Sequence, residues 1–136
     1  MDNAFLNTLK KTFLEIGYEF IDLDENLIGI ALSGKNERHI YNFVINHFLE
    51  DDSCLLMLSR EFVSSKYNKH DLLDVFNKLN ISKAITGATI FLNKLELENS
   101  EMKAVFYERL LNNDVARILD VFEDMLGILE EFDKIE

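Results

Sequence analysis

The chain has 136 residues, of which 48% are hydrophobic, and its 25 acidic residues exceed its 14 basic residues, which gives a formal net charge of −11. This length and apolar content predict one domain over residues 1–136 that buries its core without disulfide or metal support. Because the negative charge repels phosphate backbones and anionic lipids, nucleic acids and membranes are excluded as favourable partners.

The single cysteine, Cys54, cannot form an internal disulfide, and it precedes the apolar run of residues 55–58. This setting predicts a buried thiol in a reducing compartment. The sequence places Asp2 where a secretory signal carries positive charge, and no apolar run approaches the roughly 20 residues that span a bilayer. We therefore expect a soluble, cytoplasmic protein.

A first helix is predicted over residues 3–16. Its apolar residues recur three and four positions apart and so share one helical face; they are Phe5, Leu6, Leu9, Phe13 and Ile16. Asp2 or Asn3 can cap the start of this helix, and Gly17 can adopt the left-handed conformation that ends it.

Four strands are predicted next, at residues 18–23, 27–32, 40–48 and 54–62. Short polar turns separate them, of which residues 24–26 form the tightest. Neighbouring strands joined by short turns pair antiparallel, so these four segments predict a meander.

The second half of the chain returns to helical spacing over residues 68–79 and then predicts two strands, 84–95 and 102–110, around a turn at residues 98–101. A long amphipathic helix is predicted over residues 113–135. The resulting order is α-β-β-β-β-α-β-β-α, which predicts an α+β fold with an antiparallel sheet and helices packed on one of its faces.

Sequence patterns that support catalysis, a cofactor or a metal are missing. The chain has neither the Gly-x-Ser-x-Gly nor the His-Glu-x-x-His motif, and no glycine-rich phosphate loop. Residues 22–33 begin like a calcium loop, but Leu27 and Ser33 stand where that loop requires glycine and glutamate. We therefore predict that the protein is not an enzyme and holds neither a cofactor nor a metal.

The last predicted helix has more apolar surface than one sheet face would bury. Val121, Ile128 and Ile135 recur every seven residues beside its main apolar row, and together the two rows cover an arc of roughly 200°. We predict that this second row contacts a second copy of the chain or another protein.

The later strands also have apolar residues on both faces. Leu55, Met57, Phe91, Val105 and Tyr107 have the same parity within their strands and alternate with a second apolar set. Two apolar faces require either helices on both sides or a face that binds another chain. We therefore predict that Phe91, Val105 and Tyr107 also belong to a protein-binding or dimer interface.

The ordered elements resemble the type III secretion chaperone-like fold, including the YbjN-domain family, over nearly the entire chain. The resemblance rests on the helical segment 72–80, on the hairpin with residues 90–92 and 105–107, and on the long last helix. It implies a bacterial homodimer of small acidic subunits. In the chaperone branch such a dimer holds an extended client segment, and in the YbjN branch it binds proteins in a regulatory or chaperone-like role.

The leading hypothesis is a nonenzymatic, chaperone-like homodimer that holds a protein partner through apolar sheet and helix surfaces, with its acidic charge favouring basic or amphipathic clients. The alternative is a regulatory domain that binds a small molecule in a pocket between the sheet and the C-terminal helix. An enzyme with a dispersed acid-base site ranks third.

Overall fold

The computed structural model describes residues 3–33, 40–63, 89–95, 99–109 and 114–133, together with Asp74 and Asn77. Its helices and strands, in chain order, are α1 (Ala4–Glu15), β1 (Ile21–Asp24), β2 (Leu27–Ser33), β3 (Ile40–Phe48), β4 (Ser53–Val63), β5 (Thr89–Leu95), β6 (Asn99–Arg109) and α3 (Val115–Asp133). The helix predicted over residues 68–79 lies outside the described residues, apart from Asp74 and Asn77, which are helical.

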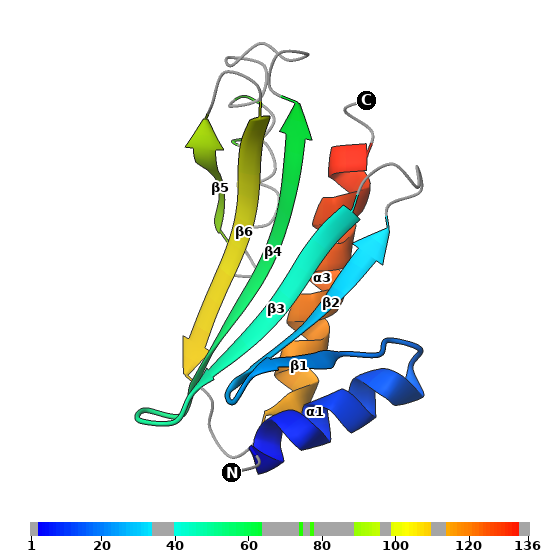
Figure 1. Ribbon diagram of the computed structural model, residues 1–136, viewed down its shortest axis with the longest axis vertical. Coiled ribbons are helices and arrows are strands. Elements are labelled where there is room, and N and C mark those ends of the chain that lie inside the picture. Colours follow the sequence, from blue (N-terminus) through cyan, green and yellow to red (C-terminus); the bar gives the residue numbers. More distant parts are fainter. Residues whose placement is uncertain are drawn as a thin grey trace.

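The six described strands form one antiparallel sheet in the order β1-β2-β3-β4-β6-β5 (Figure 1). The first four strands make the predicted meander, and β5 and β6 make the predicted second hairpin, which joins the sheet through β6 and β4. β6 begins at Asn99, so the turn predicted at residues 98–101 is too long. The reason is that Ser100 and Glu101 pair with both β4 and β5.

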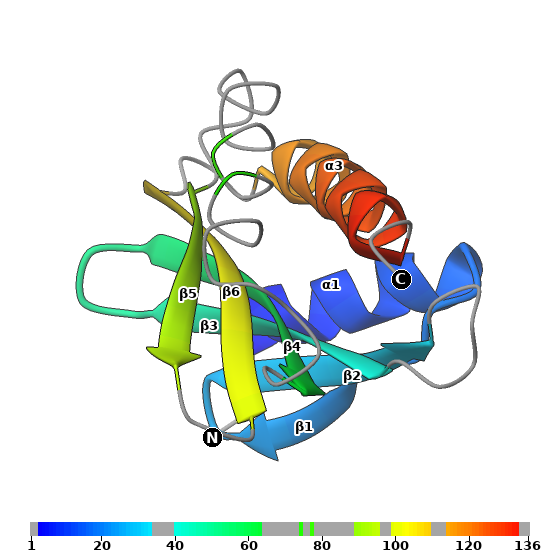
Figure 2. The ribbon, with the colours of Figure 1, turned by 90° about the horizontal axis from the view of Figure 1, so that it is seen from above.

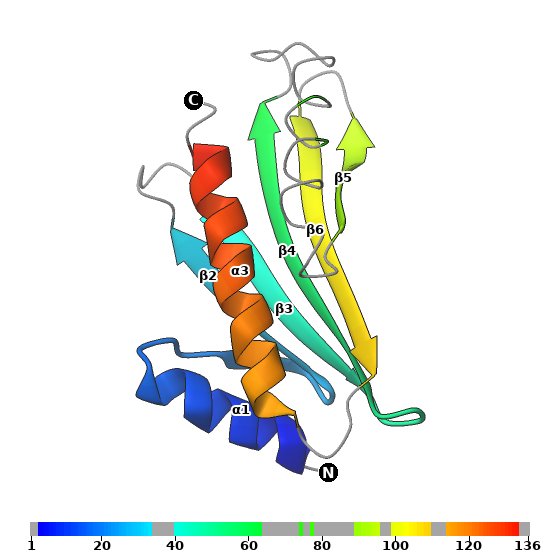
Figure 3. The ribbon, with the colours of Figure 1, turned by 180° about the vertical axis from the view of Figure 1, so that it is seen from behind.

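Helices α1 and α3 pack against the same face of the sheet, which is the nearer face in Figure 3; Figure 2 views the molecule from above and shows both helices on one side of the sheet. Side chains from both helices join those of β2, β3 and β4 in one buried cluster. No helix in the described part of the chain covers the opposite face, seen in Figure 1, and we call it the open face. The predicted fold class is confirmed.

Both ends of α1 carry the predicted caps. The Asn3 side chain accepts a hydrogen bond of 3.1 Å from a backbone N–H of the first turn, so Asn3 rather than Asp2 is the N-cap. Gly17 has a φ of 97°, and the N–H groups of Gly17 and Tyr18 donate to the carbonyls of Leu14 and Phe13. This pair of hydrogen bonds ends α1 in a Schellman motif, which needs the left-handed conformation that glycine adopts without strain.

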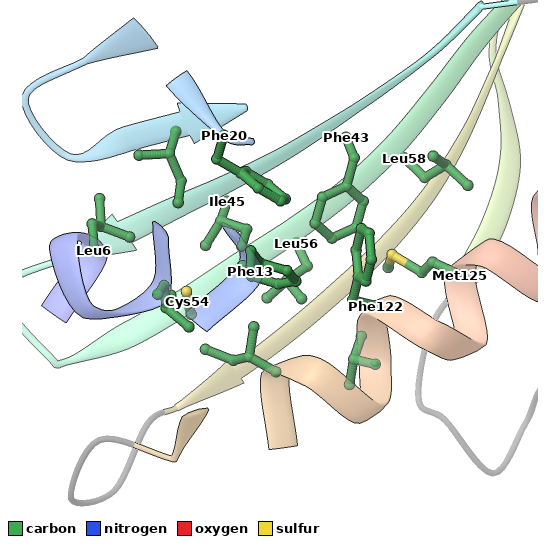
Figure 4. Packing of buried hydrophobic residues seen from close by; sticks show 14 of the residues in the cluster. Leu6, Phe13, Phe20, Phe43, Ile45, Cys54, Leu56, Leu58, Phe122 and Met125 are labelled. Carbon is green, nitrogen blue, oxygen red and sulfur yellow. The ribbon is translucent and has the colours of Figure 1, made fainter. Parts of the chain in front are cut away.

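The ring of Phe122 on α3 lies at the centre of an aromatic cluster (Figure 4). Its centroid is 4.9 Å from the rings of Phe13, Tyr18 and Phe43, and 6.1 Å from that of Phe20. Most of these contacts are edge-to-face, the arrangement that aromatic quadrupoles favour. The cluster therefore joins α1, the segment after it, β3 and α3.

This cluster explains why β1 is shorter than predicted. Residues 18–20 are not part of the strand, and the pairing of β1 with β2 starts at Ile21. Phe20 is buried in the core and Tyr18 is half-buried beside Phe122. Burial of these two rings against α3 takes the segment away from the sheet.

Replacing Phe122 with alanine is expected to lower the free energy of unfolding by about 3–5 kcal/mol, because it removes a fully buried ring and leaves a cavity. Urea unfolding followed by circular dichroism measures this loss. Asp120→Ala, at an exposed position of the same helix, serves as the control and should change stability by less than about 0.5 kcal/mol. Equal effects of the two substitutions would contradict the stabilising role of the aromatic cluster.

Candidate partner-binding surface

The register aligns one residue from each strand in a single row across the sheet. From β1 to β5 the row contains Ile21, Gly29, Val44, Met57, Val105 and Thr89. Residues paired in an antiparallel sheet share a face. The buried residues of β3 and β4 occupy the alternate positions, so this row belongs to the open face.

The predicted interface positions of β5 and β6 fall in this row and in its two neighbours. Val105 pairs with Met57, Tyr107 pairs with Leu55, and Phe91 pairs with Lys103. The backbone therefore brings all three positions to one region of the sheet. Their role in binding stays a prediction.

The described side chains make this face apolar near β1. Ile21 and Leu23 are 59% and 50% exposed, while Val44 and Met57 are half-buried. Between Ile21 and Leu23, Asp22 pairs with Lys10 of α1 at 2.7 Å, so the acidic side chain lies toward the helices. The strand thus presents Ile21 to the open face and Asp22 to the other, and a register shift after Asp22 pairs Asp24 with Leu27.

Gly29 allows the edge strand to lie close to its neighbours. A Cβ atom at this position would lie 2.6 Å from Cδ1 of Leu23 and 3.2 Å from a methyl group of Val44. The missing side chain leaves space that Leu23 fills from the adjacent strand. The result is a continuous apolar surface over β1, β2 and β3.

Ile21 and Leu23 were not among the predicted interface residues. The available signal was the alternation Ile21-Asp22-Leu23-Asp24, in which every second residue is apolar. The aromatic residues just before it extended the predicted strand and obscured where the alternation begins.

The structure corrects the prediction for Val121. Val121 has no exposed surface and belongs to the core cluster, so no partner can contact it. Ile118, Val121, Phe122 and Met125 are all buried, and their i, i+3, i+4, i+7 spacing makes them one helical face. Val121 therefore belongs to the main apolar row of α3, and an aspartate there would bury an unpaired carboxylate.

The other two members of the predicted helix row lie beyond what the structure describes. Ile128 occupies a helical position within α3, but its side chain is not among those described. Ile135 lies outside the described residues. An interface role for these two residues stays a prediction.

The described space between the sheet and α3 is filled by side chains. Phe13, Phe43, Phe122 and Met125 meet there with at most 1% of their surface exposed (Figure 4). The predicted small-molecule pocket between the sheet and the C-terminal helix therefore has no support from these packed residues. A small-molecule pocket would have to be formed by other parts of the chain.

Cys54 is buried on the helix-covered face, as predicted. Burial away from water, with a smaller contribution from the charge of Asp52, raises the pKa of its thiol from 9.0 to about 12. The thiolate, which is the reactive form, is thus strongly disfavoured at neutral pH. Among the described residues, no three potential metal-ligating side chains cluster, and no helix is long and apolar enough to cross a bilayer.

The sequence matches no protein-family model and no curated protein. The fold, in contrast, is found in solved structures and defines a class of α+β proteins, of which two similar structures are examples. One is the crystal structure of YbjN from E. coli, a proposed transcription regulator, with a TM-score of 0.65 and 13% identity over 95% of this chain and 91% of that one.

The second is a chain in the crystal structure of the ExsC–ExsE complex, with a TM-score of 0.63 and 14% identity over 98% of this chain and 96% of that one. Identities this low establish a shared fold. The predicted resemblance is therefore confirmed at the level of the fold, which this chain shares with YbjN and with a chain of the ExsC–ExsE complex.

The buried Cys54 thiol is expected to react with Ellman's reagent at pH 8 only when the protein unfolds, because its raised pKa and its burial both suppress the thiolate. The rate of reaction should rise with urea in parallel with the unfolded fraction, and the chain in concentrated urea is the control. Equally rapid labelling in the absence of urea would show that the thiol is accessible in the folded protein.

Proposed function

We propose that the chain is a single-domain, nonenzymatic, chaperone-like protein of the bacterial cytoplasm that forms a homodimer and holds a protein partner. The observation that carries this proposal is the apolar row on the open face, where Ile21, Val44 and Met57 lie in register. The ExsC–ExsE complex supports it, because a chain of that protein complex has the same fold.

Burial of apolar surface supplies the affinity in this proposal. Each Å² of apolar surface removed from water contributes roughly 25 cal/mol, and Ile21 and Leu23 each retain half or more of their accessible surface in the monomer. A second copy of the chain placed over the open face would cover these side chains. The half-buried Val44 and Met57 would extend the contact toward the centre of the sheet.

The charge of the chain determines which partners are suitable. With a net charge of −11, the protein attracts basic segments and keeps an apolar complex in solution. Two aspartates alternate with Ile21 and Leu23 along β1, at the edge of the sheet. An extended client that alternates apolar and basic residues would complement this strand.

Analytical ultracentrifugation at several protein concentrations tests the homodimer. Met57→Lys and Ile21→Lys are expected to raise the dissociation constant of the dimer at least about tenfold, because each places a charge in an apolar contact. Asn7→Lys adds the same charge at an exposed position of α1 and should leave the constant unchanged.

Circular dichroism of each variant shows whether the fold is retained, and Ile21→Lys is the safer substitution because Ile21 is 59% exposed in the monomer. A protein that sediments as a monomer at every concentration would contradict self-association. A dimer whose strength is insensitive to both lysine substitutions would place the interface elsewhere on the molecule.

A further inference from the structure

A partly buried polar network joins the start of α1 to the turn before β2 and to the end of β3. The side-chain nitrogen of Asn3 lies 2.9 Å from Nδ1 of His47 and donates to Oδ1 of Asn26, also at 2.9 Å. The side-chain oxygen of Asn3 accepts the N–H of Leu6 as the helix cap. Asn3 thus makes three hydrogen bonds, which use both of its N–H donors and one acceptor site.

Both the side chain and the backbone of His47 make close contacts. Its side chain is 6% exposed, its Nε2 lies 2.8 Å from a carboxylate oxygen of Asp52, and its ring packs 4.9 Å from the ring of Phe5. The backbone N–H of His47 donates to the carbonyl of Asn26 at 2.9 Å. The ring therefore has a fixed position between α1 and the turn that joins β3 to β4.

These contacts determine which ring nitrogen carries the proton. A backbone N–H can only donate, so the Asn3 atom that faces the N–H of Leu6 must be the amide oxygen. The NH₂ group of Asn3 therefore faces His47. An amide NH₂ also only donates, so Nδ1 of His47 must accept from it and carry no proton. The ring is then neutral, with Nε2–H donating to Asp52.

We infer that His47 is a proton-sensitive latch that holds the first turn of α1 against the sheet while its ring is neutral. A proton on Nδ1 would make the His47 ring nitrogen a donor, and it would then face the NH₂ group of Asn3, which is also a donor. Two donors cannot form a hydrogen bond, so this contact would be lost. Rotation of the Asn3 amide would restore that contact but would turn the NH₂ group toward Leu6 and remove the helix cap. Protonation therefore breaks one bond of the network in either orientation.

The groups around the ring determine the direction of the effect. Among the described residues, α1 contributes the uncharged Asn3 and Phe5, the turn between β1 and β2 contributes Asn26, and β4 contributes the un-ionised thiol of Cys54, which pairs with His47 in register. The carboxylate of Asp52 is in contact with the ring, and the carboxylates of Glu50 and Asp51 in the same turn line the pocket beside His47.

Asp52 has a 56% exposed side chain, so solvent screens the added attraction between this carboxylate and a protonated ring. Against that small gain stand a lost hydrogen bond and a charge placed at a nearly buried site. The first turn of α1 is therefore most firmly docked while the His47 ring is neutral, and protonation of the ring weakens this docking.

This latch is independent of dimerisation and of any client, since all its contacts lie within one chain. Leu6, in the first turn, is buried in the core, whereas Phe13 near the other end of α1 is held by the aromatic cluster. Loss of the latch should loosen the start of the helix and leave its end in place, which is a local opening rather than global unfolding.

Amide hydrogen exchange of the full-length protein, followed by NMR at pH 7.5 and pH 5.5, tests the inference. After correction for the intrinsic pH dependence of exchange, protection of the Leu6 amide should fall by about fivefold to tenfold at the lower pH, as expected for one lost hydrogen bond, and protection at the end of α1 should not change. His47→Asn is the matched control, because the asparagine oxygen can accept from Asn3 and does not titrate.

The His47→Asn variant should retain the same protection at both pH values. Equal protection of Leu6 in the wild-type chain at the two pH values, or the same fall in the variant, would overturn the inference. The ¹⁵N signals of the His47 ring at pH 7.5 provide a second test that needs no substitution. They should show a protonated Nε2 and an unprotonated Nδ1, and the opposite tautomer would overturn the inference that His47 accepts a hydrogen bond from Asn3.

Discussion

Phe122 packs its ring against aromatic residues from α1, from the segment that follows α1 and from β3, and these contacts join both described helices to the sheet. α3 is held across one face of the sheet, and α1 is held beside it through Phe13. The segment after α1 is drawn onto α3 by Tyr18 and Phe20, which delays the first strand until Ile21. Both described helices are thereby committed to the same face.

Because both described helices pack on one face, the second face of the antiparallel sheet has no described helix over it. The row from Ile21 to Met57 crosses this face in register, and no described helix covers it, which is the basis of the proposed protein binding. YbjN and a chain of the ExsC–ExsE complex show that the same backbone arrangement occurs in other proteins. The proposed binding role rests on the surface of this chain and not on the fold itself.

Local patterns in the sequence were sufficient for most elements and insufficient for contacts between distant segments. The caps of α1 and the strands of the meander follow from residues adjacent in the chain. The pairing of β4 with β6 joins residues far apart in sequence. Val121 was misplaced because a seven-residue repeat cannot show how wide a face the sheet buries. The network of Asn3, Asn26 and His47 has no sequence signal, since only folding brings these residues together.

Two methionines offer the most direct test of the claim that the open face binds a second chain. Met57 is half-buried on the open face, and Met125 is 1% exposed in the core. In a protein labelled with ¹³C at the methionine methyl groups, the account predicts that the NMR signal of Met57 shifts or broadens as the protein concentration rises, while the signal of Met125 stays constant. Association detected by light scattering with an unchanged Met57 signal would contradict the account.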